Sequence, residues 1–230
     1  MHASIDCRFI ADVYTDFPEK FGIPRQSGLA KSVVGRVVFR PQFRNREAVR
    51  GLEEFSHIWL LWEFSECEGR GWSPTVRPPR LGGNKRMGVF ATRSPYRPNP
   101  IGLSAVKLEK IVFEKELGPV LYISGADIMN KTPVLDIKPY LPFADCVASA
   151  RGGFADGVFD NDAIVVCDEE LLKVLPGDKQ QGLIEVLRGR PEPSYHSDKE
   201  RVYAMSFAGF RIRFTAGERE IRVIDIEKEV

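Results

Sequence analysis

Residues 57–64 read HIWLLWEF, a short aromatic and apolar run bounded by polar residues, which is typical of a buried β-strand. A short helix is predicted at residues 46–55, because its apolar positions fall on one face. The regular spacing of the apolar runs, with glycines and prolines between them and no long helical pattern, predicts a β-barrel or a β-sandwich. The other runs lie at residues 32–39 (SVVGRVVF), 87–92, 103–113 and 120–124.

The second part of the chain changes character after residues 142–162, whose Ala, Gly and Asp content predicts a loop or linker. Asp168 is expected to cap a helix that ends at Pro176, and a second helical run around Leu183 stops at Gly189. Further strands are expected at residues 201–207, 210–214 and 221–226.

The fold class predicted from these patterns is mainly β with an α+β appendage. Residues 1–143 are expected to form an N-terminal β-barrel, residues 144–165 a linker, and residues 166–230 a small α+β domain. A chain of 230 residues with 43% hydrophobic content can bury the core of one large domain or of two small ones.

Residues 76–104, VRPPRLGGNKRMGVFATRSPYRPNPIGLS, are the most informative stretch for function. They carry six basic side chains and no acidic one. Prolines such as Pro98 and Pro100 fix φ near −65°, and glycines such as Gly88 permit backbone geometry that other residues avoid. A stiff cationic loop suits a pre-shaped pocket for an anionic or nucleotide-like ligand. It equally suits a basic surface loop with no ligand.

Charge is unevenly distributed in a chain that is nearly neutral overall, with 33 Lys and Arg against 32 Asp and Glu. Residues 24–50 contain seven basic side chains and one acid, and acids gather later, around residues 156–170. This separation favours a basic face that meets a polyanion, and its Arg-rich composition favours bidentate contacts. A solvated surface is the alternative.

Several classes of protein are excluded or disfavoured by the sequence. The four cysteines are scattered, with no CxxC pair and no His at ligand spacing, so no metal site is expected. Walker, GxSxG, HExxH and GxGxxG motifs are absent. No signal-peptide pattern opens the chain and no run of about 18 apolar residues occurs, so a cytoplasmic location is expected.

Four ordered motifs identify a family. FSHIWLLWEF (residues 55–64), RPPRLGG (77–83), GVFATRSPYRPNPIGLS (88–104) and TPVLDIKPY (132–140), preceded by PRQSGL (24–29), closely resemble the TsaA-like family. Full-length bacterial members of that family are the TrmO tRNA methyltransferases. The resemblance covers roughly residues 10–143. It implies a homodimer whose β-barrel holds S-adenosylmethionine without a Rossmann fold. It also implies methylation of N6 of threonylcarbamoyladenosine, the base just 3′ of the tRNA anticodon.

The resemblance also implies which residues bind the cofactor. Thr-Asp-Phe stands at residues 15–17 where relatives often have Ser-Pro-Tyr, so only the backbone role carries over there. The implied set is Thr15, Asp16, Phe17, His57, Ile58, Arg93, Leu103, Val134, Leu135, Asp136 and Ile137.

Each polar candidate also has a structural alternative. His57 is either a ligand or a satisfied core residue. Arg93 either meets the cofactor carboxylate or pairs with Asp136, which itself either binds ribose hydroxyls or the methionyl amine, or caps a local turn. Trp59 and Trp62 are expected in the core. Arg97 and Asn99 are expected to order the proline-rich loop.

The C-terminal part departs from the family pattern. A DPRPxY motif of relatives is replaced by RPEPSY at residues 190–195, with the acid and the arginine exchanged for opposite charges. This exchange either preserves an ion pair in reverse or alters the grip on tRNA. Residues 210–214 resemble the family's FxVRW, so Tyr195, Arg190 and Arg213 are expected to bind substrate, with Tyr195 or His196 assisting proton removal.

The residues themselves leave two other functions open. One is a non-catalytic RNA-binding module built on a barrel. The other is a methyltransferase of a different class that acts on a small molecule.

Overall fold

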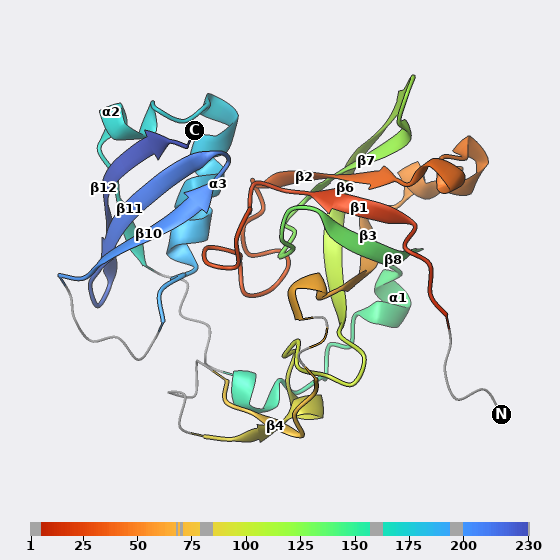
Figure 1. Ribbon diagram of the computed structural model, residues 1–230, viewed down its shortest axis with the longest axis horizontal. Coiled ribbons are helices and arrows are strands. Elements are labelled where there is room, and N and C mark those ends of the chain that lie inside the picture. Colours follow the sequence, from red (N-terminus) through yellow and green to blue (C-terminus); the bar gives the residue numbers. More distant parts are fainter. Residues whose placement is uncertain are drawn as a thin grey trace.

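The computed structural model describes residues 6–67, 69, 71–78, 85–156, 163–193 and 200–229. Six antiparallel strands close into a barrel in the order β1-β2-β7-β6-β3-β8 (Figure 1). Closure pairs every strand on both sides and removes exposed sheet edges. The predicted barrel is therefore confirmed. Its strands are β1 (Ala11–Tyr14), β2 (Val34–Phe39), β3 (His57–Glu63), β6 (Ile101–Glu114), β7 (Gly118–Ser124) and β8 (Thr132–Pro139).

Strand alternation decides which side chains fill the barrel. Along β3, Ile58, Leu60 and Trp62 point inward and are buried, as expected for Trp62. The expectation that Trp59 lies in the core is wrong, because its side chain points outward from the same strand and is only half-buried. Its indole Nε1 donates to Asp145 Oδ2 at 2.9 Å, in the short helix α1 (Pro142–Asp145), which lies where a loop or linker was expected at residues 142–162.

Two predicted elements of the first domain differ from the structure. Residues 46–55 form two 3₁₀ turns, η2 (Arg46–Val49) and η3 (Leu52–Glu54), instead of one helix. Gly51 between them has φ 81°, which a right-handed helix cannot continue through. The strand expected at residues 87–92 is only β5 (Met87–Gly88), which pairs with β4 (Thr75–Val76) before η6 (Val89–Ala91) begins.

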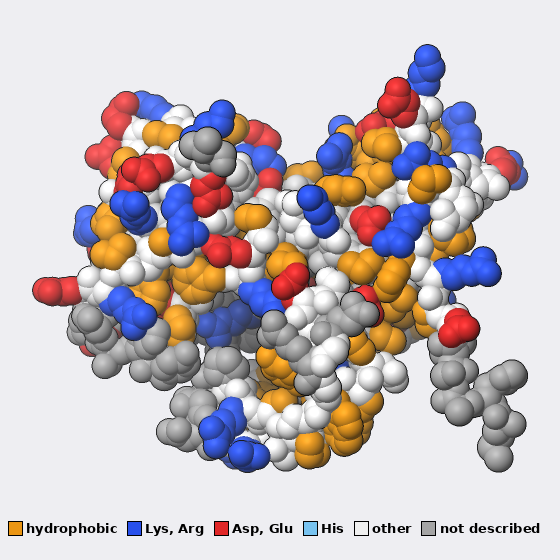
Figure 2. Space-filling model, viewed as in Figure 1, with side chains coloured by type: hydrophobic (Ala, Val, Ile, Leu, Met, Phe, Trp, Pro, Cys, Tyr) orange, Lys and Arg blue, Asp and Glu red, His pale blue; other side chains and the backbone are white. Residues whose placement is uncertain are grey.

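The segment that contains β4, β5 and η6 forms a lobe beside the barrel, around β4 in Figure 1. Arg97 donates to the carbonyl oxygens of Val89 and Thr92, at 3.3 and 2.7 Å, so it orders the proline-rich loop as expected. Figure 2 shows hydrophobic side chains gathered on the surface of this lobe. The described residues before the C-terminal domain also contain the 3₁₀ turns η1 (Pro41–Phe43), η4 (Ser65–Cys67) and η7 (Gly153–Ala155).

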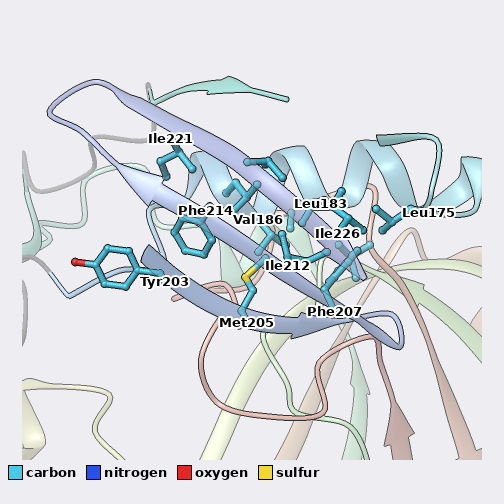
Figure 3. Close-up of a cluster of buried hydrophobic side chains, with 14 of the residues drawn as sticks. Leu175, Leu183, Val186, Tyr203, Met205, Phe207, Ile212, Phe214, Ile221 and Ile226 are labelled. Carbon is cyan, nitrogen blue, oxygen red and sulfur yellow. The ribbon is translucent and has the colours of Figure 1, made fainter. Parts of the chain in front are cut away.

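The C-terminal domain is a four-stranded sheet, ordered β10-β11-β12-β9, with α3 packed on it. Asp168 Oδ1 accepts from the backbone N–H of Glu170 at 2.8 Å, which confirms the predicted cap. Leu183 and Val186 of α3 face Ile212 and Phe214 of the sheet in the buried core (Figure 3). The elements are β9 (Ile164–Val166), α2 (Glu169–Leu172), α3 (Gly177–Arg188), β10 (Val202–Phe207), β11 (Phe210–Ala216) and β12 (Glu220–Lys228).

The connection between β1 and β2, residues 15–33, joins the two domains. Phe17, Ala30 and Val33 are buried in the core of the C-terminal domain rather than in the barrel core. Ser32 Oγ donates to Glu185 Oε1 of α3 at 2.7 Å. The red-orange connection accordingly lies between the barrel and the C-terminal domain in Figure 1. Because the domains share buried side chains, their relative position is fixed by packing.

Candidate functional site

The cofactor candidates Leu103 of β6 and Asp136 of β8 lie on the outer surface of the barrel, on either side of β3. In the strand register, Leu103 lies opposite Leu61, and Leu61 lies opposite Asp136. Leu103 is 51% exposed, and this row faces away from the barrel interior. A register shift at Leu61/Trp62 leaves Leu135 as an extra residue of β8. Such bulges redirect side chains and occur often beside functional sites. We call Leu61, Leu103, Leu135 and Asp136 the outer wall.

His57 lies at the start of β3 and is exposed, so the alternative that it is a core residue is wrong. Its Nδ1 is 2.9 Å from Ser56 Oγ, and its ring centroid is 6.2 Å from that of Tyr140. The imidazole is therefore accessible to a ligand on the outer surface.

Three other candidates can offer a ligand only their backbone. Ile58 and Val134 point into the barrel core, and Phe17 points into the core of the C-terminal domain. Ile137 is half-buried against the barrel core. A buried apolar side chain is not available to a ligand on the surface. Side-chain contacts with a cofactor must therefore come from the other candidate residues.

Arg93 and Asp136 each have another partner in the structure. The Arg93 guanidinium donates to Gln26 Oε1 in the β1–β2 connection. Asp136 instead pairs with Lys138 Nζ at 2.9 Å, while its Oδ1 accepts from the backbone N–H of Ile137 at 2.9 Å. Asp136 therefore does cap its own backbone, and its carboxylate stays half-exposed on the outer wall.

A chain of polar side chains at the end of the barrel was missed by the sequence reasoning. Trp62 Nε1 donates to Ser104 Oγ at 3.0 Å, and Ser104 Oγ donates to Asp127 Oδ1 at 2.5 Å. The backbone of Ser27 and the positive charge of Arg93 also act on the Asp127 carboxylate, and both favour its charged form. We call Trp62, Ser104, Asp127, Ser27 and Arg93 the rim cluster.

Burial raises the pKa of Asp127, although the hydrogen bond from Ser104 and the charge of Arg93 oppose this effect. Ser104 itself is fully buried. The outer wall and the rim cluster meet in β6, where Leu103 faces outward and Ser104 faces inward. Two members of the rim cluster lie in or near family motifs, although the motifs assign them no role: Asp127 precedes TPVLDIKPY (residues 132–140), and Ser27 belongs to PRQSGL (residues 24–29).

Thr15 and Asp16 are held between the barrel and the C-terminal domain. Thr15 Oγ1 donates to the carbonyl of Ile128 at 2.9 Å, and Thr15 N–H donates to Asn130 Oδ1 at 3.2 Å. The Asp16 carboxylate pairs with Lys179 Nζ at 2.7 Å. Their side chains therefore position the connection.

The exchanged charges of the C-terminal motif form an ion pair. Arg190 Nη2 lies 2.9 Å from Glu192 Oε1 and also donates to the carbonyl of Gly217 at 2.7 Å. Arg190 is thus mostly enclosed, whereas Arg213 is half-exposed on β11, 3.4 Å from Asp225. Tyr195 and His196 lie outside the described residues.

The donor set fits a ligand with a carboxylate, an amine or hydroxyls, and an apolar part, as in S-adenosylmethionine. Arg93 supplies a cation, Asp136 supplies an acceptor for N–H or O–H donors, and Leu103 supplies exposed apolar surface. Within the described ranges, no group of three or more His, Cys, Asp or Glu is placed to hold a metal ion. No helix in those ranges is long and apolar enough to cross a membrane.

Comparisons with known proteins agree over both domains. Residues 12–146 match the family model of the tRNA-methyltransferase O N-terminal domain, and residues 163–229 match that of the TrmO C-terminal domain. An Escherichia coli K12 protein named tRNA (adenine(37)-N6)-methyltransferase is 40% identical over 95% of this chain and 96% of its own length.

Two other relatives support this placement. A Pseudomonas aeruginosa protein named putative S-adenosylmethionine-dependent methyltransferase RcsF is 47% identical over 70% of this chain and 65% of its own length. A crystal structure of TrmO from P. aeruginosa superposes with a TM-score of 0.79 at 33% identity, covering 99% of each chain. Matches of this length in sequence and in fold show that the chain belongs to the TrmO family of tRNA methyltransferases.

Proposed function

We propose that this protein transfers a methyl group from S-adenosylmethionine to N6 of adenine 37 in tRNA, the position 3′ of the anticodon. The observation that carries the proposal is the similarity to the E. coli tRNA (adenine(37)-N6)-methyltransferase, which extends over nearly the full length of both chains. The strand register supports it, because Leu103 of β6 and Asp136 of β8 lie on either side of Leu61 on the outer surface of the barrel. We further propose that the accepted base carries the threonylcarbamoyl group.

Bound S-adenosylmethionine would supply a methyl group on a positively charged sulfur. Arg93 is proposed to hold its carboxylate, Asp136 its hydroxyl or ammonium groups, and His57 and Leu103 to flank it. Methyl transfer is an in-line displacement, so these residues chiefly align the reacting atoms and exclude water. The backbones of residues 15–17, 58 and 134–137 complete the proposed site.

Substrate tRNA is proposed to contact both domains. Exposed arginines of the barrel, such as Arg36, Arg46 and Arg50, are available to phosphates. Figure 2 shows several Lys and Arg side chains over the barrel side of the molecule. Tyr195 and Arg213 are proposed to recognise the base and its carboxylate, whereas Arg190 is proposed to shape the motif through Glu192. In this division residues 1–143 bind the cofactor and residues 166–230 recognise tRNA.

A homodimer in the cytoplasm is part of the proposal. Exposed apolar side chains beside the outer wall support it, because monomers rarely leave such groups in contact with water without a purpose. Ile101 and Leu103 lie on β6, and Phe143 of α1 is 88% exposed, with Val147 following it.

The decisive experiment combines purified protein, labelled S-adenosylmethionine and tRNA from cells with or without the threonylcarbamoyl modification. Methylation of the modified pool alone is expected. Equal methylation of both pools would refute the threonylcarbamoyl assignment. Binding of tRNA without any methyl transfer would favour a non-catalytic RNA-binding module. Turnover of a small molecule that tRNA does not inhibit would favour the other class of methyltransferase.

A further inference from the structure

We propose that the Asp127 carboxylate accepts the proton that leaves N6 during methyl transfer, an assignment that rests on the proposed function. N6 of the modified base belongs to a ureido group, whose lone pair is delocalised. Its proton must therefore leave as, or before, the nitrogen attacks. A positioned carboxylate at the end of the barrel provides an acceptor for it.

The step balances without any further reactant. The N6–H bond breaks, and its electron pair stays on nitrogen while N6 bonds to the methyl carbon. The methyl–sulfur bond breaks, and its electron pair returns to sulfur, which loses its positive charge. Asp127 holds the released proton as a carboxylic acid and passes it to water after turnover.

The direction of the hydrogen bonds fixes how the carboxylate is held. An indole N–H can only donate, so Ser104 Oγ accepts from Trp62 at 3.0 Å. The single hydroxyl proton of Ser104 is then directed to Asp127 Oδ1, 2.5 Å away. The Ser104 hydroxyl therefore orients the Asp127 carboxylate in its charged, proton-accepting form.

The surroundings also make this carboxylate a stronger base than an exposed one. Burial disfavours the charged form and raises the pKa of Asp127. The positive charge of Arg93 acts on Asp127 in the opposite direction and lowers its pKa. The charge that acts on the proposed base is thus the guanidinium that is also proposed to hold the cofactor carboxylate.

His57 is another titratable site candidate on the barrel, and it is poorly placed for this role. It begins β3, whereas Trp62 of the rim cluster lies five residues further along the strand. At about 3.3 Å per residue, this separates His57 from the cluster by roughly 16 Å. His57 is therefore suited to a contact at the far end of the cofactor.

The primary test is Asp127→Asn, which keeps an amide oxygen for Ser104 but cannot take up a proton. We expect kcat on threonylcarbamoylated tRNA to fall about 100- to 10,000-fold. Affinities for S-adenosylmethionine and for tRNA, measured by calorimetry, should stay within about threefold of the original protein, since neither contact is removed. Asp178→Asn is the matched control, because it neutralises an exposed carboxylate on α3, and it should leave kcat unchanged.

A second readout does not depend on turnover. Carboxyl ¹³C NMR of the cofactor-free protein should show Asp127 titrating above the usual range for Asp, and the acidic limb of the kcat–pH profile should follow that titration. Ser104→Ala removes a donor to the charged form, so both the titration and the acidic limb should move to higher pH.

Three results would overturn the assignment. These are an unchanged kcat in Asp127→Asn, loss of cofactor affinity in that variant, and an acidic limb that does not follow the Asp127 titration. Failure of the proposed function has a different signature, because the unmutated protein itself would then methylate no tRNA.

Discussion

Lys179 Nζ lies 2.7 Å from Asp16 Oδ2 and joins α3 of the C-terminal domain to the first residues after β1. Both side chains are mostly enclosed, so the pair is screened less by water than a surface pair is. Thr15, the neighbour of Asp16, is tied to Ile128, the residue after Asp127. The Asp16–Lys179 contact between the domains is therefore linked to Asp127 of the rim cluster through the hydrogen bond between Thr15 and Ile128.

Replacing Lys179 by Met should lower the free energy of unfolding by about 1–2 kcal/mol, because Asp16 loses a charge-assisted hydrogen bond. Urea denaturation measures this loss. Lys173→Met is the matched control, since Lys173 pairs with Glu170 on the exposed surface and should cost at most about 0.5 kcal/mol. Equal losses in the two variants would show that the Asp16 contact does not hold the domains together.

Arg93→Ala and Asp136→Ala should each weaken binding of S-adenosylmethionine roughly ten- to a hundredfold while the fold persists, because each removes a charge-assisted bond of about 1.5–3 kcal/mol. Calorimetry gives the affinity, and circular dichroism checks the fold. Arg222→Ala, which removes a surface pair with Glu220, should leave binding unaltered. Unchanged affinity in both site variants would place the cofactor elsewhere.

Acid should weaken the domain contact through Glu185. Burial by itself would raise the pKa of Glu185, but hydrogen bonds from the backbone and hydroxyl of Ser32, together with Gln181 and the charge of Arg188, outweigh it and lower that pKa below its ordinary value of 4.5. The folded state then binds the proton more weakly than the unfolded state does. The stabilisation is complete above pH 4.5 and is lost as the pH falls through the lower, folded-state pKa.

Glu185→Gln should accordingly show a flatter dependence of unfolding free energy on pH below 4.5 than the original protein. Urea midpoints recorded at a series of pH values measure it. If the two dependences coincide, the Ser32–Glu185 contact does not contribute to acid sensitivity.

The pair formed by Arg190 and Glu192 should show coupling in a double-mutant cycle. Arg190→Asp or Glu192→Arg alone places like charges together and should cost about 2 kcal/mol or more, because Glu192 is buried. The double variant restores opposite charges in the family's order. The loss of unfolding free energy in the double variant should therefore be smaller than the sum of the two single losses, by about 1 kcal/mol or more. Additive losses in denaturation experiments would show that the pair contributes nothing.

Local patterns alone determined the class of fold and many of its elements. The apolar run at residues 57–64 became β3, and Asp168 became a helix cap, because strand alternation and capping depend on residues close in sequence. The motif resemblance likewise identified the family and the segments that carry the candidate site. Such motifs can be recognised in the sequence because the residues of each one lie close together along the chain.

Pairing between strands decided the structure of segments whose own sequence patterns do not predict a strand. β8 contains two prolines and alternates poorly, yet it forms a strand because β1 and β3 pair with it on either side. Conversely, residues 46–55 carry a helical pattern but turn twice, because Gly51 adopts φ 81°. These outcomes depend on partners and backbone angles that periodicity does not encode.

The rim cluster could not be derived from the sequence. Trp62, Ser104 and Asp127 are more than twenty residues apart from one another, and Ser27 comes from yet another segment. Only closure of the barrel brings their polar groups together, and only burial in that closed end raises the pKa of Asp127. The sequence by itself determined the family and the chemistry available to it. The tertiary structure decided which of those groups meet, because hydrogen bonding and desolvation act over distances in space rather than along the chain.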